Sequence, residues 1–169
     1  MAVIYNDNHF YEIFVPKLKE AINYVLENIT EENIKAIDAM IYTSNSPDVY
    51  SRTYEFREAW DKTTASSGNT ATGSFFYEPS KMSINPEDGQ HASLVTGEDF
   101  REYLADVIYN GFNDKLFGGG WWSNGRNAFK VLQQWLTNSQ FRQLFEEGMT
   151  KAGIPWSKSV GAVQREAIK

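Results

Sequence analysis

The chain has no cysteine and only two histidines among its 169 residues. The absence of cysteine excludes disulfide bonds, thiolate nucleophiles and zinc–thiolate sites. The two histidines, His9 and His91, are too few for a multi-histidine metal centre. No segment approaches the roughly 18 apolar residues of a membrane helix, and residues 1–10 lack the basic and then apolar pattern of a secretory signal. We therefore expect no metal, no cofactor and no membrane association, and synthesis in a reducing cytoplasm.

Basic residues are outnumbered by acidic ones. The net charge is −6 and the pI is about 5.0. An acidic protein repels nucleic-acid phosphates on average, which argues against general DNA binding. Net charge does not fix the distribution of charge, so a local basic ring around a DNA channel and an acidic lumen in which DNA slides are both consistent with this composition.

The apolar content is sufficient for a folded core. Hydrophobic residues make up 41% and aromatic residues 15% of the chain. The length suits one domain, since domains commonly have about 100–200 residues. Residues 156–169 contain few core-forming side chains. We expect a single domain over residues 1–155 and a C-terminal tail that either frays or is ordered against a neighbouring subunit.

The N-terminal part of the chain has helical spacing of apolar residues from Phe10 to Ser44. Proline is tolerated in a first helical turn, which places the start of the regular helix at Val15 or Pro16. Thr30 followed by two glutamates resembles a new helix start. The pattern therefore predicts either one long helix that bends near Asn28 or two helices that meet there.

The middle of the chain is rich in Thr, Ser and Phe and predicts a β-hairpin. We expect strands at residues 63–65 and 70–77, connected by residues 66–69, with a bulge at Gly73. Three more helices are predicted: one that begins near Thr96 and stops at Gly111, one at residues 126–136, and one capped by Ser139 that ends at Gly153. Together these elements predict an α+β domain, in which a long N-terminal helix and C-terminal helices pack on a small, mainly antiparallel β-sheet.

Two segments could carry chemistry. Ser93, His91 and a nearby aspartate could be imagined as a hydrolytic triad, but the sequence has no nucleophile elbow, and a small hydrolase ranks last among our hypotheses. Residues 118–120 are three glycines followed by Trp121 and Trp122, and this loop lacks the lysine of a phosphate-binding loop. The two tryptophans could cover the core, anchor a subunit interface or stack on a sugar. We expect no catalytic residues, hence no enzyme.

The segment from Asp48 to Trp60 is the most informative motif. It contains Tyr50, Arg52 and Thr53, and it ends in an apolar position, Phe56, and an Ala-Trp pair. This segment resembles the hinge of small siphophage neck and tail-completion (head–tail joining) proteins. The order of a long helix, this motif, a β-region, a boundary at residues 107–111 and a closing helix is also similar.

The chain departs from that family's pattern at two points. Tyr54 stands where the family often has a glycine, and the loop at residues 118–122 is longer than the usual connection. Arg52 and Arg57, both in this segment, are each expected to have Glu55 or Glu58 as a nearby partner for an ion pair.

The resemblance implies a structural virion protein that forms a homo-oligomeric ring, sixfold or twelvefold, at the head–tail junction or the head-proximal end of the tail. Its partners would be copies of itself and the neighbouring connector and tail-tube proteins, and genomic DNA would pass through the lumen without sequence-specific binding. The protein would be made in the host cytoplasm and end in the virion. The resemblance does not separate a connector from a tail terminator.

The resemblance also assigns roles to residues. Tyr50, Arg52 and Thr53 would fix the turn from helix to sheet and help to build the assembly surface. The i, i+4 spacing of Phe56 and Trp60 separately predicts that both pack inward. Candidate interface residues are Trp121, Trp122 and Trp156. The alternative function is a glycan-binding accessory module that uses Trp121 and Trp122.

Overall fold

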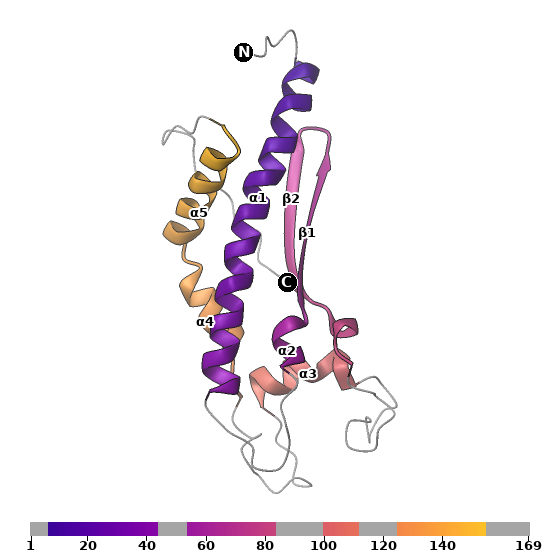
Figure 1. The fold of residues 1–169 in the computed structure, drawn as a ribbon, viewed down its shortest axis with the longest axis vertical. Coiled ribbons are helices and arrows are strands. Elements are labelled where there is room, and N and C mark those ends of the chain that lie inside the picture. Colours follow the sequence, from indigo (N-terminus) through magenta and orange to yellow (C-terminus); the bar gives the residue numbers. More distant parts are fainter. Residues whose placement is uncertain (1–6, 44–53, 84–99, 112–124, 155–169) are drawn as a thin grey trace, which may run out of the picture.

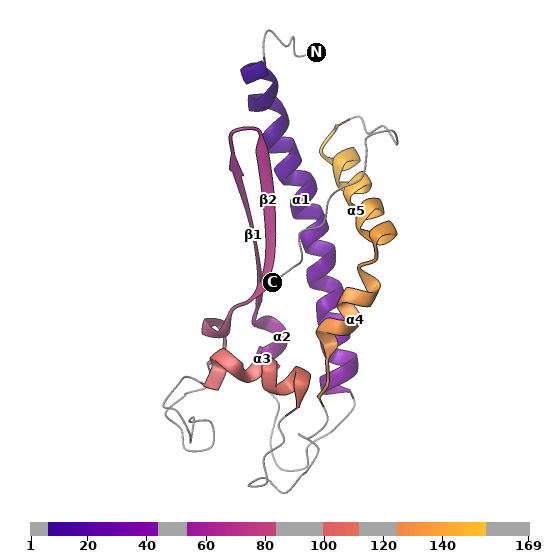
Figure 2. The same ribbon diagram turned by 180° about the vertical axis from the view of Figure 1, so that it is seen from behind.

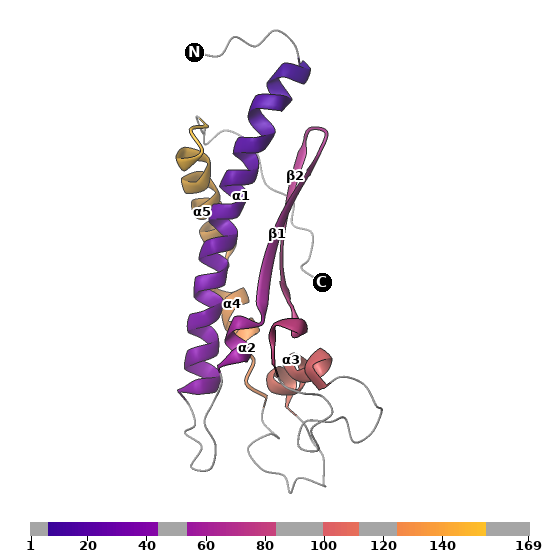
Figure 3. The same ribbon diagram turned by 45° about the vertical axis from the view of Figure 1, so that its right-hand side comes forward.

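The computed structural model describes residues 7–43, 54–83, 100–111 and 125–154, and it has three layers. The long helix α1 lies in the middle, a two-stranded hairpin covers one side of it, and α4 and α5 cover another side (Figures 1 and 3). This arrangement confirms the predicted α+β class. The elements in chain order are α1 (Asp7–Ile37), the π-helix η1 (Asp38–Tyr42), α2 (Glu55–Glu58), β1 (Trp60–Ser67), β2 (Thr70–Tyr77), the 3-10 helix η2 (Pro79–Lys81), α3 (Phe100–Asn110), α4 (Ala128–Trp135) and α5 (Asn138–Lys151).

The N-terminal helix is a single element that is longer than predicted. The Thr30 hydroxyl donates a hydrogen bond to the Leu26 carbonyl within α1, 2.8 Å away, so the expectation of a new helix start at Thr30 is wrong. The helix begins at Asp7, and Pro16 therefore lies inside it, where the ring removes one intrahelical hydrogen bond. The chain continues without a break into η1, which ends the layer at Tyr42.

The hairpin pairs its strands in one unbroken antiparallel register from Trp60–Tyr77 to Ser67–Thr70. The second strand has the predicted bounds. The first runs from Trp60 to Ser67 instead of residues 63–65, so Ser66 and Ser67 belong to the strand and the connection is shorter than predicted. Gly68 has a φ of 57° at the first of the two turn positions, a conformation that glycine adopts at no steric cost and that is typical of a type II′ turn.

Glycines allow both neighbouring layers to approach α1 closely. Gly73 does not form the predicted bulge, because it pairs with Thr64 in regular register. A Cβ atom at Gly73 would collide with the Cγ2 of Ile22 on α1. On α5, a Cβ atom at Gly148 would lie 2.6 Å from the carbonyl oxygen of Ala21. Gly73 therefore leaves room for side chains of α1, and Gly148 leaves room for its backbone.

The C-terminal helices follow the predicted order with one corrected cap. α3 ends at Gly111, as predicted, with a φ of 80°. The side chain of Thr137 accepts a hydrogen bond from the backbone N–H of Gln140, so Thr137 and not Ser139 caps α5. The predicted helix start at residues 96–99, the glycine–tryptophan loop and the C-terminal tail lie outside the described residues.

The core follows α1 as three adjacent apolar clusters. The cluster near the N-terminal half of α1 joins it to α5, the middle cluster joins it to α4 and α5, and the third lies around the end of α1, α2 and α3. Figure 2 shows how these helices are arranged along α1. The most buried members are Ala21, Met149, Val25, Leu132, Ile37, Ala59, Met82 and Ala128.

Candidate functional site at the joint between helix and hairpin

The structure describes two of the predicted site residues, Phe56 and Trp60. They lie where α1, α2 and the hairpin meet, and both pack inward as expected. The other candidates lie outside the described residues, and so do the residues of the imagined hydrolytic triad. These are Tyr50, Arg52, Thr53, Trp121, Trp122, Trp156, His91 and Ser93.

Tyr54 introduces α2 with a left-handed backbone. Its φ is 61°, a conformation that costs a non-glycine residue free energy. This is the position at which the resembled family often has glycine. Two contacts hold the ring of Tyr54: its centroid lies 4.5 Å from that of Tyr42, and the guanidinium carbon of Arg57 lies 5.4 Å from it. The joint thus keeps a backbone bend that favours glycine while using a tyrosine ring to contact the end of the helical layer.

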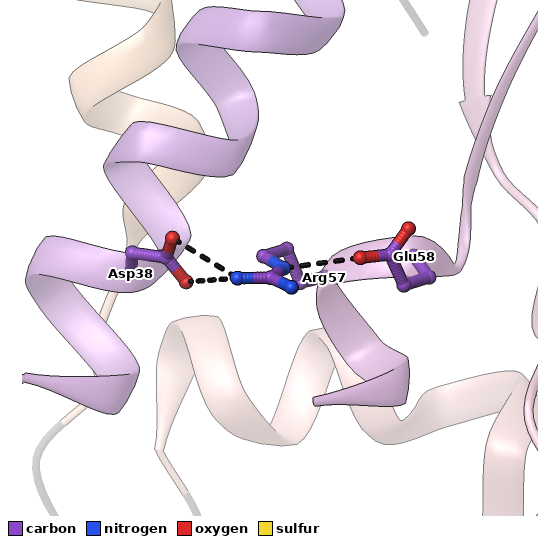
Figure 4. Close-up of polar contacts among 3 residues, drawn as sticks. All are labelled: Asp38, Arg57 and Glu58. Atoms are coloured by element: carbon purple, nitrogen blue, oxygen red, sulfur yellow. Dashed lines mark hydrogen bonds and ion pairs between the residues drawn. The ribbon is translucent and has the colours of Figure 1, made fainter. Parts of the chain in front are cut away.

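Arg57 connects α2 to the first residue of η1 (Figure 4). Its Nη1 lies 3.3 and 3.4 Å from the two carboxylate oxygens of Asp38, and its Nε donates a hydrogen bond to Glu58 at 3.1 Å. Partial burial opposes the charged form of Arg57, but the hydrogen bond to Glu58 and the charge of Asp38 outweigh it and raise the pKa of the guanidinium. The pairing with Glu58 was predicted, whereas Asp38 is 19 residues away in sequence and gave no local signal.

Trp60 is the centre of an aromatic stack that joins four elements. Its ring is stacked on Phe75 of β2, Tyr109 of α3 and Phe129 of α4, with centroid distances of 5.4, 6.2 and 6.1 Å. The buried ring of Phe56 meets it edge-on at 6.4 Å. Such offset-stacked and edge-to-face pairs add to the free energy gained by burial. The stack fixes the hairpin base relative to the helices.

The interior of the joint includes polar atoms without protein partners among the described residues. These are the indole N–H of Trp60 and the hydroxyl of Tyr109; the amide of Asn33, a fully buried residue of α1, also has no partner among the described residues. Burial, and secondarily the nearby Tyr77, raises the pKa of the Tyr109 hydroxyl, which therefore stays neutral. The neighbouring Tyr77 hydroxyl is satisfied, since it donates to the carbonyl of Arg101 at 2.8 Å.

Charged side chains cover the outer edge of β1 at its base. The carboxylate of Asp61 accepts a hydrogen bond from the backbone N–H of Lys62 at 2.7 Å and pairs with the Nζ of Lys81 at 3.0 Å. Lys81 also donates to the carbonyl of Trp60 at 3.2 Å. The hydrogen bonds from the Lys62 amide and from Lys81 lower the pKa of Asp61. The first backbone groups along this edge are therefore already occupied.

We compared the chain with known families and structures. No family model, curated protein or solved structure matches it. Within the described residues, no three His, Asp or Glu side chains are grouped so that they could hold a metal ion, and no helix is long and apolar enough to cross a membrane. What the structure defines is an α+β protein in which an aromatic joint holds a hairpin on a long central helix.

Proposed function

We propose that this protein is a structural component of a tailed-phage virion that forms a ring at the head–tail junction or at the head-proximal end of the tail. The observation that carries the proposal is the position of the motif: its described end, Phe56 and Trp60, forms the joint that sets the hairpin on α1. A hinge segment that fixes a sheet on a helix is what the resemblance to neck and tail-completion proteins implies for this stretch.

The distribution of surfaces supports the same proposal. α1 covers one face of the hairpin, while the other face carries mostly small exposed side chains, with the partly exposed ring of Phe76 near the base. A rigid body with a fixed, uncovered hairpin suits a subunit whose remaining contacts come from neighbours. In a ring the mechanism is complementarity alone, since each subunit presents one patch to the preceding copy and a different patch to the next.

The test is electron microscopy of lysates from a phage that carries this gene, after the gene has been interrupted. We expect DNA-filled heads separate from tails if the protein is a connector, and tails of abnormal length if it is a terminator. Supplying the wild-type gene in trans is the control and should restore particles, whereas Arg52→Ala, in the motif, should restore fewer. Intact, normally shaped particles without the gene would overturn the proposal.

A further inference from the structure

Beyond the charged base of β1, the two edges of the hairpin differ from the rest of the surface in having no charge. Residues 63–77, which include the outer half of β1, the turn and all of β2, contain no Asp, Glu, Lys, Arg, His or Pro. In the whole chain, 22% of residues are charged. Natural proteins usually prevent an edge strand from pairing with another chain by placing lysine, proline or a bulge on it. β1 has Lys62 near its base, but residues 63–77 have none of these features.

The register shows which backbone groups face outward. In a hairpin with a two-residue turn, the pair next to the turn is hydrogen-bonded, and hydrogen-bonded and non-hydrogen-bonded pairs then alternate. Ser67–Thr70 is that first pair, so Ser66–Ala71 and Thr64–Gly73 are non-hydrogen-bonded and direct their N–H and C=O groups away from the partner strand.

The base of β1 supports this assignment. By the same alternation Lys62 directs its N–H outward. This N–H donates a hydrogen bond to the carboxylate of Asp61. Farther along, the outward groups of Thr64 and Ser66 have no such cap within the part of the chain that the structure describes. One edge is thus closed at its base by side chains and open toward the turn.

The opposite edge is open in the same way. The outward groups of Ala71 and Gly73 on β2 also have no hydrogen-bond partner among the described residues. The face toward α1 is occupied, because Gly73 is packed against Ile22. The open backbone groups lie in the plane of the sheet, so a further strand would pair with the hairpin at its edges.

We propose that the partner at these edges is a second copy of this chain, with the β1 edge of one copy paired to the β2 edge of the next. The two open rows point in opposite directions from one hairpin and have complementary donors and acceptors. If β1 of one copy pairs antiparallel with β2 of the next, neighbouring strands continue to alternate in direction through both copies. Each copy then uses its β1 edge for one neighbour and its β2 edge for the other. This inference rests on the proposed ring and names its interface.

The charge distribution favours a second copy over a partner of different chemistry. Two copies with a net charge of −6 repel each other over most of their surface. The hairpin edges are a place where the two molecules can meet without like charges directly opposite. A charged strand from another protein would find no opposite charge on residues 63–77. The hairpin of a second copy instead brings small polar side chains of the same size as those it would lie beside.

Sedimentation velocity of the full chain over a range of concentrations tests the pairing. We expect reversible self-association, and we expect Ser66→Pro with Ala71→Pro to weaken it about tenfold or more, because proline removes an outward N–H while leaving the intramolecular ladder intact. The matched control, Ser66→Ala, keeps the backbone donor and should associate like the wild type. A wild-type chain that stays monomeric, or proline variants that associate equally well, would overturn the inference.

A second pair of variants avoids the risk that proline unfolds the hairpin. Ser66→Lys with Thr72→Lys places one charge on each strand at exposed positions, and Gln133→Lys with Gln134→Lys makes the same change in charge at exposed positions of α4. We expect only the hairpin variant to lose association; equal behaviour of the two variants would contradict edge pairing. This experiment and the electron microscopy can fail independently. If the chain self-associates through the hairpin but particles form normally without the gene, edge pairing is supported and the virion role is refuted.

Discussion

The two ends of the hairpin are the same kind of structure in different surroundings. At the base, Trp60 and Phe75 are part of the aromatic stack, and Asp61 and Lys81 occupy the edge. Toward the turn, residues 63–67 and 70–74 carry small side chains that are largely exposed. The comparison indicates that the two ends have different roles. The base fixes the direction of the hairpin, while the side chains of the outer half are left largely exposed by the other described residues of the chain and are available to another molecule.

The strongest test of this contrast is to remove the base anchor. Trp60→Ala should lower the free energy of unfolding by about 3 kcal/mol, because it removes a large ring that stacks on three others. The matched control is Phe76→Ala on the outer face of β2, where the side chain is 37% exposed and the cost should be below about 1 kcal/mol. Urea denaturation followed by circular dichroism measures both. Equal losses would mean that the base is not the anchor.

Between base and turn, the hairpin depends on close approach to α1. Gly73→Ala should destabilise the protein by about 1–3 kcal/mol, because the new Cβ atom would collide with Ile22 and lie 3.1 Å from the Cδ1 of Leu26. The same denaturation measurement in an Ile22→Ala background sharpens the test. There the collision is relieved, and Gly73→Ala should become nearly neutral or stabilising, since alanine lowers the entropy of the unfolded chain. The same loss in both backgrounds would show that the close approach is not the cause.

The sequence predicted the outer half of this hairpin better than its surroundings. The bounds of β2 came out correctly because its signals are local: Thr and aromatic residues favour a strand, and a Gly-Asn pair favours the turn. The role of Gly73 was wrongly predicted as a bulge, since nothing near it in sequence indicates that Ile22 lies above it. Sequence patterns within a strand predict the strand itself, but they do not predict which helix packs against it.

The candidate site shows the same limit. Phe56 and Trp60 were predicted to pack inward from their spacing alone, and they do. The partners that make the joint, Tyr109 and Asp38, come from α3 and η1, and only the folded chain brings them together. The start of α1 was missed for a related reason, because Pro16 was taken as a first-turn residue, whereas a helix with a buried face tolerates it in its interior.

The smallest expected effect concerns the charged cap at the base of β1. Hydrogen bonds from the Lys62 amide and Lys81 lower the pKa of Asp61 below its ordinary value of 3.8, so the unfolded chain binds a proton at this site at a higher pH than the folded chain does. The contribution of Asp61 to stability is therefore complete above about pH 4 and is lost as the pH falls through the lowered folded pKa. We expect Asp61→Asn to have a lower thermal midpoint than the wild type at pH 6, with a gap that closes as the solution is made more acidic.

Thermal unfolding at a series of pH values measures this gap, and Asp106→Asn, at an exposed position on α3, is the control for the loss of one carboxylate. A gap for Asp61→Asn that stays constant down to the lowest pH would mean that the carboxylate's charge does not hold the cap. Asp61→Ala, which unlike Asp61→Asn also removes the acceptor oxygen, should expose the N–H of Lys62 in addition to those of Thr64 and Ser66. If the open edge is what pairs with a second copy, Asp61→Ala should then associate at least as strongly as the wild type. The same residue thus separates the two roles of the hairpin, because its loss weakens the anchored base without closing the open edge.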